Sequence, residues 1–223
     1  MRTRFLAPAL LCLAVAGCDD DPVTVVGDPF TALRVINAAS GPVDVLADGQ
    51  RVLVALAPSA VSMRLPISAA QHSVQLRATG TASTTASLAV SVSPGRTATV
   101  YARPAASGLA AAALSDTGAA PVAGKSKLRV VHLAANAPAL DVWRTQPDYT
   151  TPIRVMFPFA YLAESNYMQS DPGAWTVSVT REGETAPFLA TSGTVTVGAG
   201  EVRTVVLLDA PGNGVKIEPL DEQ

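Results

Sequence analysis

Apolar and polar residues alternate along much of this chain. The segments 61–67 (VSMRLPI), 72–77 (HSVQLR) and 87–93 (SLAVSVS) place apolar side chains at every second position. Because successive side chains of a β-strand point to opposite faces, a period of two predicts half-buried strands. Asp48-Gly49 suits a two-residue hairpin turn, since both positions of such a turn need positive φ. We therefore expect short strands joined by tight turns.

One segment of the chain occurs twice in similar form. Residues 33–46 (LRVINAASGPVDVL) are echoed by residues 128–143 (LRVVHLAANAPALDVW), so that Arg34 corresponds to Arg129. The offset between matching residues grows along the chain and never reverses, which is typical of two homologous units whose second copy has longer loops. Each copy has the length of an ordinary domain, and we expect each to bury its own apolar interior.

The predicted fold is all-β, with two tandem immunoglobulin-like antiparallel β-sandwich domains after a cleaved signal peptide. Regular short strands favour such sandwiches over closed barrels. The boundaries are a signal peptide at 1–17, a tether at 18–29, the first domain at 30–114, a linker at 115–127 and the second domain at 128–223.

The first residues predict a membrane attachment. Arg2 and Arg4 precede the apolar run 5–16, which is too short to cross a bilayer and is typical of a secretory signal. The run ends in Val-Ala-Gly-Cys, which resembles the bacterial lipobox, and this resemblance implies a lipid on Cys18. The membrane is then a partner through that lipid. We expect the protein in the bacterial cell envelope, facing the periplasm or the cell surface.

Composition narrows the classes of function. The chain has a net charge of −2 and only 15% charged residues, without a cluster of Lys or Arg after the first four positions, so we expect no nucleic-acid partner. Cys12 leaves with the signal peptide, so no disulfide is expected. His72 and His132 lie in different copies, which argues against a metal site, and the absence of a glycine-rich phosphate loop argues against a cofactor.

The two repeated segments, 33–46 and 128–143, contain candidate site residues. Asp44 and Asp141 sit between apolar neighbours, and an acid there can accept hydrogen bonds from backbone N–H groups of the preceding loop. Asn37 in the first copy stands where the second has His132. Because Asn bonds but does not titrate, we interpret these four residues as a structural clamp of the loop.

The repeated segments resemble a bacterial family, the domain of unknown function numbered 4397. In the second copy the pattern is matched by Val130, Val131, His132, Ala137, Pro138, Asp141 and Val142, and in the first by Val35, Pro42, Val43, Asp44, Val45, Asp48 and Gly49. The resemblance implies immunoglobulin-like domains in secreted or lipid-anchored proteins, often in tandem, without an established activity. The first copy lacks two loop residues and the second lacks the Asp-Gly turn.

Two hypotheses of function follow. The first is a lipid-anchored envelope protein, not an enzyme, that presents two sandwich domains for binding or structural spacing. The alternative is a hydrolase of an envelope polymer that uses His132 and Asp141, with Ser165 or Glu164 as a third member.

Aromatic residues are concentrated in the second copy. We interpret Trp143 and Trp175 as core residues. Four other aromatics lie in a Pro-rich insertion that we expect to be a loop, and Phe157 and Phe159 are expected to share one face. Because loops on a rigid scaffold often carry binding residues, we hypothesise that these four contact an envelope protein or a glycan. They are Tyr149, Phe157, Phe159 and Tyr161.

Overall fold

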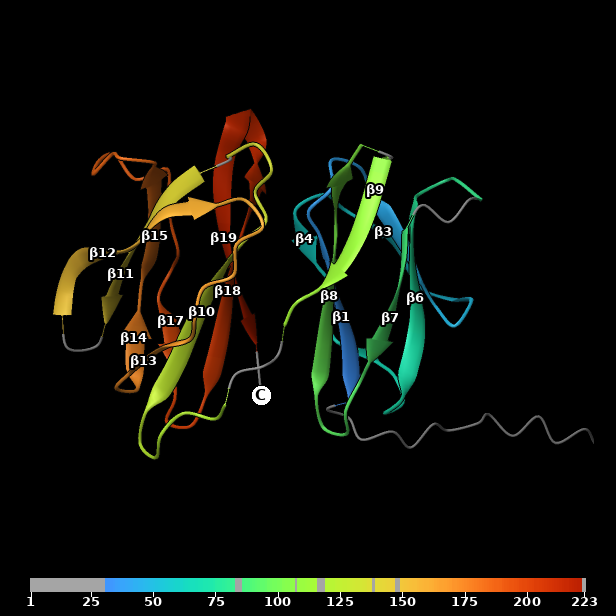
Figure 1. Cartoon of the computed structure of the whole chain (residues 1–223), viewed down its shortest axis with the longest axis horizontal. Helices are drawn as coiled ribbons and strands as arrows, with labels where there is room; N and C mark the ends of the chain where they lie inside the picture. The colour runs from blue at the N-terminus through green and yellow to red at the C-terminus, as the bar shows by residue number, and fades with distance from the viewer. Residues whose placement is uncertain are drawn as a thin grey trace, which may run out of the picture.

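The computed structural model describes residues 31–82, 86–106, 108–115, 119–137, 139–146 and 149–221. Nearly all of its regular structure is β-strand, which confirms the predicted all-β, sandwich-like fold (Figure 1). One short 3₁₀ helix, η1 (Pro211–Asn213), joins the last two strands. The predicted signal peptide, the lipid site Cys18 and the tether 18–29 lie outside the described residues.

The first copy consists of two sheets. One sheet has the order β4-β1-β8-β9, with β5 also paired to β1, and the other has the order β3-β2-β6-β7. The strands are β1 (Ala32–Asn37), β2 (Val43–Ala47), β3 (Gln50–Leu56), β4 (Ala60–Val61), β5 (Leu65–Pro66), β6 (Gln71–Ala78), β7 (Ala86–Ser91), β8 (Thr97–Ala105) and β9 (Gly108–Ala113).

The second copy repeats this plan and adds a two-stranded sheet, β14-β17. Its larger sheets have the orders β13-β10-β18-β19 and β12-β11-β15-β16. The strands are β10 (Ser126–His132), β11 (Ala139–Gln146), β12 (Tyr149–Ala160), β13 (Met168–Ser170), β14 (Gly173–Trp175), β15 (Val177–Arg181), β16 (Ala190–Thr191), β17 (Val195–Val197), β18 (Val202–Ala210) and β19 (Gly214–Asp221).

One strand pair in each copy runs parallel, whereas the other pairs are antiparallel. Strand β1 pairs in parallel with β8, with Arg34 opposite Thr99. Strand β10 pairs in parallel with β18, with Arg129 opposite Thr204. The alternation of side chains does not reveal strand direction, so the sequence could not distinguish these pairs. The two parallel pairs have the same register, as expected of two homologous copies.

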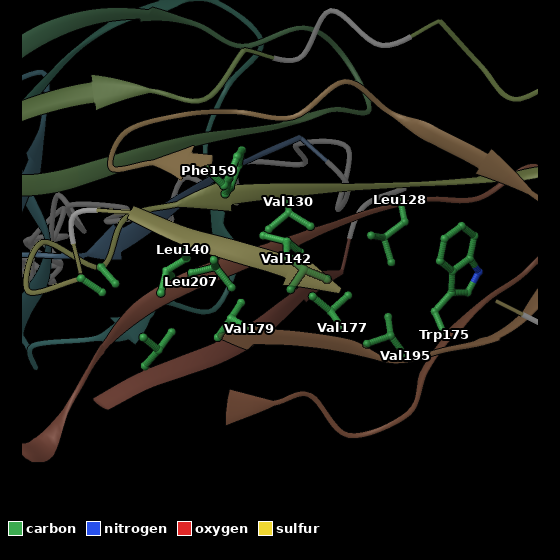
Figure 2. Packing of buried hydrophobic residues seen from close by; sticks show 14 of the residues in the cluster. Leu128, Val130, Leu140, Val142, Phe159, Trp175, Val177, Val179, Val195 and Leu207 are labelled. Carbon is green, nitrogen blue, oxygen red and sulfur yellow. The ribbon is translucent and has the colours of Figure 1, made fainter. Parts of the chain in front are cut away.

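Each copy has its own apolar core between its two sheets. Strand β6 of the first copy alternates as predicted, with Val74 and Leu76 fully buried. In the second copy, Leu128 and Trp175 point into the space between the sheets (Figure 2). Burial of such side chains contributes about 1.5 to 3 kcal/mol each. Trp175 is therefore a core residue, as interpreted from the sequence.

A third apolar cluster lies between the copies. In Figure 1, β18 and β19 stand beside β4 and β8. Ile36 and Tyr101 of the first copy pack in one cluster with Val131, Leu133 and Val206 of the second. By the register of the repeat, Ile36 corresponds to Val131 and Tyr101 to Val206, so the copies contact each other through equivalent faces, as the subunits of a twofold dimer do. Each copy thus buries its own interior, as expected from the sequence, and the two copies share this additional cluster where they meet.

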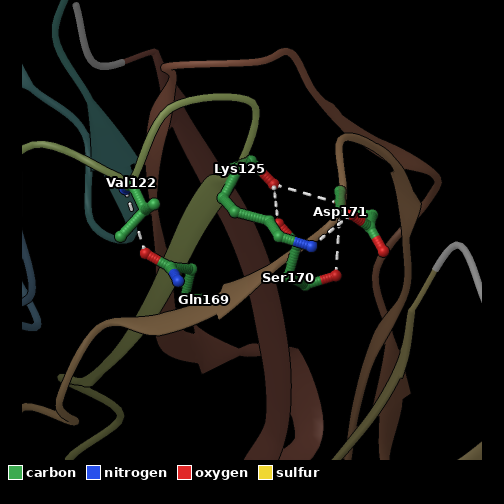
Figure 3. A network of polar contacts seen from close by, with 6 residues as sticks. Val122, Lys125, Gln169, Ser170 and Asp171 are labelled. Atoms are coloured by element: carbon green, nitrogen blue, oxygen red, sulfur yellow. Dashed lines mark hydrogen bonds and ion pairs between the residues drawn. The ribbon is translucent and has the colours of Figure 1, made fainter.

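The described part of the predicted linker is fastened to the second copy. The backbone N–H of Val122 donates to Oε1 of Gln169 at 3.1 Å, and Lys125 pairs with Asp171 at 2.6 Å (Figure 3). On the other side of the linker, the buried Arg129 donates to the backbone carbonyl of Ser115. These contacts hold both ends of the segment against β10 and β13.

Among the residues that the structure describes, no helix has the length and apolar character needed to cross a membrane.

Candidate functional site

Asn37 and His132 end corresponding strands and are both fully buried. Oδ1 of Asn37 accepts a hydrogen bond from the N–H of Ala39 at 3.0 Å, and Nδ1 of His132 accepts one from the N–H of Ala134 at 3.2 Å. The Asn37 amide also donates to the carbonyl of Gly41 at 2.9 Å. Both side chains therefore hold the chain just after the strand.

The surroundings of His132 keep it uncharged. Its ring stacks on Phe159, with centroids 5.9 Å apart, and meets the edge of Tyr161 at 6.1 Å. Burial lowers the pKa of His132 to about 4, because the loss of hydration outweighs the attraction of the Ala137 carbonyl and Asp209. A neutral ring suits the acceptor role of Nδ1.

Asp44 does not contact the loop that precedes it. Its Oδ1 accepts hydrogen bonds from the N–H of Ala55 at 2.9 Å and the hydroxyl of Thr79 at 2.8 Å, and Arg51 lies at 4.0 Å. The bond from Ala55 is the main reason that the pKa of Asp44 is lowered. The predicted partner was wrong, since the side chain points along the sheet toward β3 and the end of β6.

Asp141 occupies the same place in the second copy. Nη1 of Arg154 donates to its Oδ2 at 2.9 Å, and the N–H of Gly183 donates to the same oxygen at 3.1 Å. The Asp141 side chain is 1% exposed, whereas that of Arg154 is 34% exposed. A buried carboxylate thus fixes a guanidinium that still reaches solvent.

The residues of the hydrolase alternative are not brought together. His132 lies in the sheet of β10 and Asp141 in the sheet of β11, and each bonds to other groups. Oγ of Ser165 accepts from the N–H of Val130 at 2.9 Å and donates to a carbonyl. Ser62 makes the same bond to Val35 in the first copy. The Ser165 hydroxyl is therefore a repeated structural element.

The third candidate, Glu164, also has a partner, the guanidinium of Arg129. Its carboxylate lies 3.4 Å from Nη1 of Arg129, a guanidinium that also stacks on Tyr167 with 4.8 Å to the ring centroid. The Glu164 carboxylate is therefore paired with Arg129 and not with His132.

Another serine, histidine and aspartate do contact one another in turn, namely Ser68, His72 and Asp48. Nδ1 of His72 is 2.6 Å from Oδ2 of Asp48, and Nε2 is 3.4 Å from Oγ of Ser68. However, Nε2 is only 2.9 Å from the Ser68 carbonyl, which can only accept. Nε2 must then donate to this carbonyl. The hydrogen bond to Asp48 is the main cause that raises the pKa of His72. A ring nitrogen that donates to this carbonyl has no lone pair with which to activate the Ser68 hydroxyl.

The four predicted contact aromatics lie on a strand and the turn after it, not on a loop. Strand β12 pairs with β11, with Leu140 opposite Phe159 and Val142 opposite Met156. Phe157 and Pro158 of β12 thus lie opposite Asp141 alone, and this bulge turns Phe157 and Phe159, which are two residues apart, to different faces. Phe157 is 59% exposed, whereas Phe159 is 5% exposed and joins the core. The predicted shared face was wrong.

Tyr149 and Tyr161 are less exposed than the sequence led us to expect. Both side chains are partly buried, and both hydroxyl groups are shielded from solvent. Tyr161 packs against His132 beside the first copy, where burial raises the pKa of its hydroxyl. Of the four predicted residues, Phe157 alone is strongly exposed.

Phe157 belongs to a row of planar side chains on the outer side of the sheet β12-β11-β15-β16. The Arg154 guanidinium lies over the Phe157 ring at 4.3 Å and over the Trp143 ring at 5.7 Å from the centroids. Trp143 meets Phe188 edge-on at 6.1 Å, and Phe188 is 40% exposed. We call Trp143, Arg154, Phe157 and Phe188 the aromatic face.

Hydrogen bonds to buried groups of the sheet fix two members of the aromatic face, Trp143 and Arg154. Nε1 of Trp143 donates to the hydroxyl of Thr180 at 3.1 Å, and that hydroxyl donates to the carbonyl of Glu184 at 2.8 Å. Asp141 holds Arg154, as described above. The Trp143 ring and the Arg154 guanidinium are therefore oriented before any ligand arrives, which reduces the entropy lost on binding.

The first copy has the ionic part of this arrangement without the aromatic part. Arg51 and Arg154 occupy equivalent places, opposite Leu46 and Trp143 respectively. The interpretation of Trp143 as a core residue was wrong. Its position two residues after Asp141, on the face opposite Val142, was the sequence signal that could have revealed it.

Other features of the described residues offer less. A groove of about 470 Å³ in the first copy is lined mainly by small side chains near β7 and β8. No group of three or more His, Cys, Asp or Glu side chains in the described part of the chain is placed to hold a metal ion.

Comparison with known proteins gives one family and several distant structures. The model of the family described as Domain of unknown function (DUF4397) matches residues 31–143. A search of curated proteins finds no match.

Three solved structures are similar at low identity. CBMbc, a family CBM26 module of Amy13K from Eubacterium rectale solved with maltoheptaose, is 8% identical, with 86% of this chain and 98% of that chain covered and a TM-score of 0.28. The Bacillus anthracis TIE protein is 10% identical, with 85% and 43% covered and a TM-score of 0.25. A leucine-rich repeat protein from Bacteroides thetaiotaomicron is 11% identical, with 78% and 25% covered and a TM-score of 0.22.

Proposed function

The chain belongs to the DUF4397 family of domains of unknown function, and from this premise we propose that it is a lipid-anchored, non-enzymatic binding protein of the bacterial cell envelope. The second copy carries the binding surface. The first copy and the joint between the copies hold that surface at a fixed distance from the membrane.

The aromatic face is the observation that carries this proposal. It places Phe157 and Phe188 in solvent at 59% and 40% exposure, beside a guanidinium that a buried carboxylate orients. Exposed aromatic side chains with oriented polar neighbours are typical of binding surfaces. The equivalent face of the first copy has Leu46 in place of Trp143, so only one of the two copies carries the complete arrangement.

Co-sedimentation with isolated cell envelopes tests the surface. The full-length chain carries Cys18→Ala in every sample, so that a lipid does not contribute to sedimentation. We expect Phe157→Ala to reduce the bound fraction about tenfold, as loss of an aromatic contact does. Val54→Ala is the matched control, because Val54 is 58% exposed on the first copy. Equal binding of all variants would refute the proposal.

The lipid anchor is tested separately. We expect cells supplied with an alkyne-bearing palmitate to label the wild-type chain and not the Cys18→Ala variant. Two acyl chains or more anchor a protein stably, so the wild type should remain with the membrane fraction and the variant should be released. A wild-type chain that stays unlabelled and soluble would contradict the anchor.

The cluster between the copies supports the spacing role. Ile36, Val131 and Leu133 are almost fully buried there, and Arg129 ties the linker to the second copy. A joint with an apolar centre resists bending more than a polar contact between domains does. The two copies therefore act as one rigid arm.

A further inference from the structure

We infer that the ligand of the aromatic face is an uncharged polysaccharide chain. This inference rests on the proposed binding role of that face and names the chemistry of its ligand. Three features carry it: the spacing of the planar groups, the charge balance around them and the narrowness of the apolar surface.

The planar groups form a continuous row. Phe188, Trp143, Arg154 and Phe157 follow one another at centroid distances of 6.1, 5.7 and 4.3 Å. The faces of aromatic rings carry negative partial charge and attract weakly positive C–H groups. The C–H faces of successive sugar rings present such groups at intervals along a polysaccharide chain.

Arg154 supplies the polar contacts. Among the described residues, Asp141 is the single group that accepts a hydrogen bond from its side chain, through Nη1 at 2.9 Å. A guanidinium has five N–H donors and no acceptor, so the remaining donors are available to hydroxyl oxygens of a ligand. Sugar hydroxyls are such acceptors, and they bring no charge.

The charges around the face argue against a charged polymer. Arg154 is balanced by Asp141, and Arg181 lies 3.7 Å from Glu184. The turn that holds Asp141 also contains Glu182, so the border of the face is slightly acidic. An anionic polymer would be repelled there, whereas a cationic polymer would find each nearby carboxylate except Glu182 already paired.

The apolar surface is too narrow for a typical protein partner. Among the described residues of the second copy, the exposed large apolar side chains are those of Ile153, Phe157 and Phe188. A stable protein interface buries about 800 Å² on each partner around an apolar centre. A single row of rings interrupted by a guanidinium fits a thin, extended ligand better.

Affinity gel electrophoresis of the full-length Cys18→Ala chain tests this inference. The native gels contain amylopectin, a β-1,3-glucan or galactomannan as uncharged probes, and polygalacturonate or lipoteichoic acid as anionic probes. We expect at least one uncharged polymer to retard the protein, and Phe157→Ala and Trp143→Leu to weaken that retardation about tenfold. Val54→Ala should migrate as the wild type does.

The outcomes separate the inference from the proposed function. Retardation by an anionic polymer alone, lost in Phe157→Ala, would overturn the uncharged ligand and leave the binding role intact. Migration unchanged by any polymer, with envelope binding still dependent on Phe157, would overturn the polysaccharide in favour of a protein partner. Because Trp143→Leu removes the bond to Thr180, its melting temperature is measured beside its migration, and Phe157→Ala provides the variant without a buried contact.

Discussion

His132 and Asn37 occupy corresponding positions of β10 and β1, and each side chain accepts a hydrogen bond from the backbone N–H two residues further along. One ring nitrogen therefore replaces one amide oxygen in the same local role. The exchange removes the two bonds that the Asn37 amide donates to the carbonyls of Gly41 and Leu56, and it adds a group that titrates, because Asn does not bind a proton near neutral pH.

His132→Asn is expected to fold and to lose only about 1 to 2 kcal/mol at neutral pH, from lost ring contacts with Phe159. In the wild type the pKa of His132 is lowered from 6.5 to about 4. As pH falls below 6.5, the unfolded chain binds a proton that the folded chain rejects, so stability falls by about 3 kcal/mol down to pH 4. Urea unfolding across this range should show a flatter profile for the variant. Parallel profiles would refute the buried, neutral ring.

The pair of His72 and Asp48 should have the opposite pH dependence. The Asp48 carboxylate and the Ser68 carbonyl raise the pKa of His72 above 6.5. The stabilisation is then complete below the unfolded pKa and is lost as pH rises through the raised, folded pKa. We expect the melting temperature of wild type to fall as pH rises above 6.5, and that of Asp48→Asn to change less. Asn tolerates the positive φ of this position, so the turn is kept.

Ser165→Ala and Ser62→Ala should destabilise the protein by similar amounts, about 1 to 3 kcal/mol each, because each leaves the N–H of a buried strand without that hydroxyl partner. Chemical denaturation measures both, with the exposed Ser93→Ala as control. Envelope binding of Ser165→Ala should match wild type under conditions in which both are folded. A variant of Ser165 that kept full stability and lost activity on an envelope polymer would instead support the hydrolase alternative.

Leu133→Ala tests the joint between the copies. Leu133 is fully buried in the shared cluster, and its truncation should cost about 2 to 5 kcal/mol. The specific readout is amide hydrogen exchange in β1 and β8 of the other copy, where protection should fall. The exposed Val52→Ala should leave this protection unchanged. Loss of protection confined to the second copy would show that the copies are stable separately.

Alternation along the chain was enough to predict strands such as β6, where Val74 and Leu76 are buried and their neighbours are not. The same pattern also indicates the apolar cluster between the copies. Val130 and Val131 are consecutive apolar residues, and only a strand buried on both faces places such neighbours in two different clusters.

The candidate site was harder to predict. Asp141 was identified as a buried acid, but its partner Arg154 lies on the next strand, across a register that a bulge shifts. That bulge separates Phe157 from Phe159, and no periodicity in a segment with two prolines reveals it. Phe188 meets Trp143 through a connection between β15 and β16, which local sequence does not determine.

Photo-crosslinking in intact cells tests the central claim most directly. A photoreactive amino acid is placed at position 157 on the aromatic face or at position 54 on the first copy, both of which carry strongly exposed side chains. The account predicts a defined adduct from position 157 that is lost when Trp143→Leu is added, and none from position 54. Adducts of equal yield from both positions, or an adduct from position 157 that does not depend on Trp143, would contradict a binding surface on the second copy.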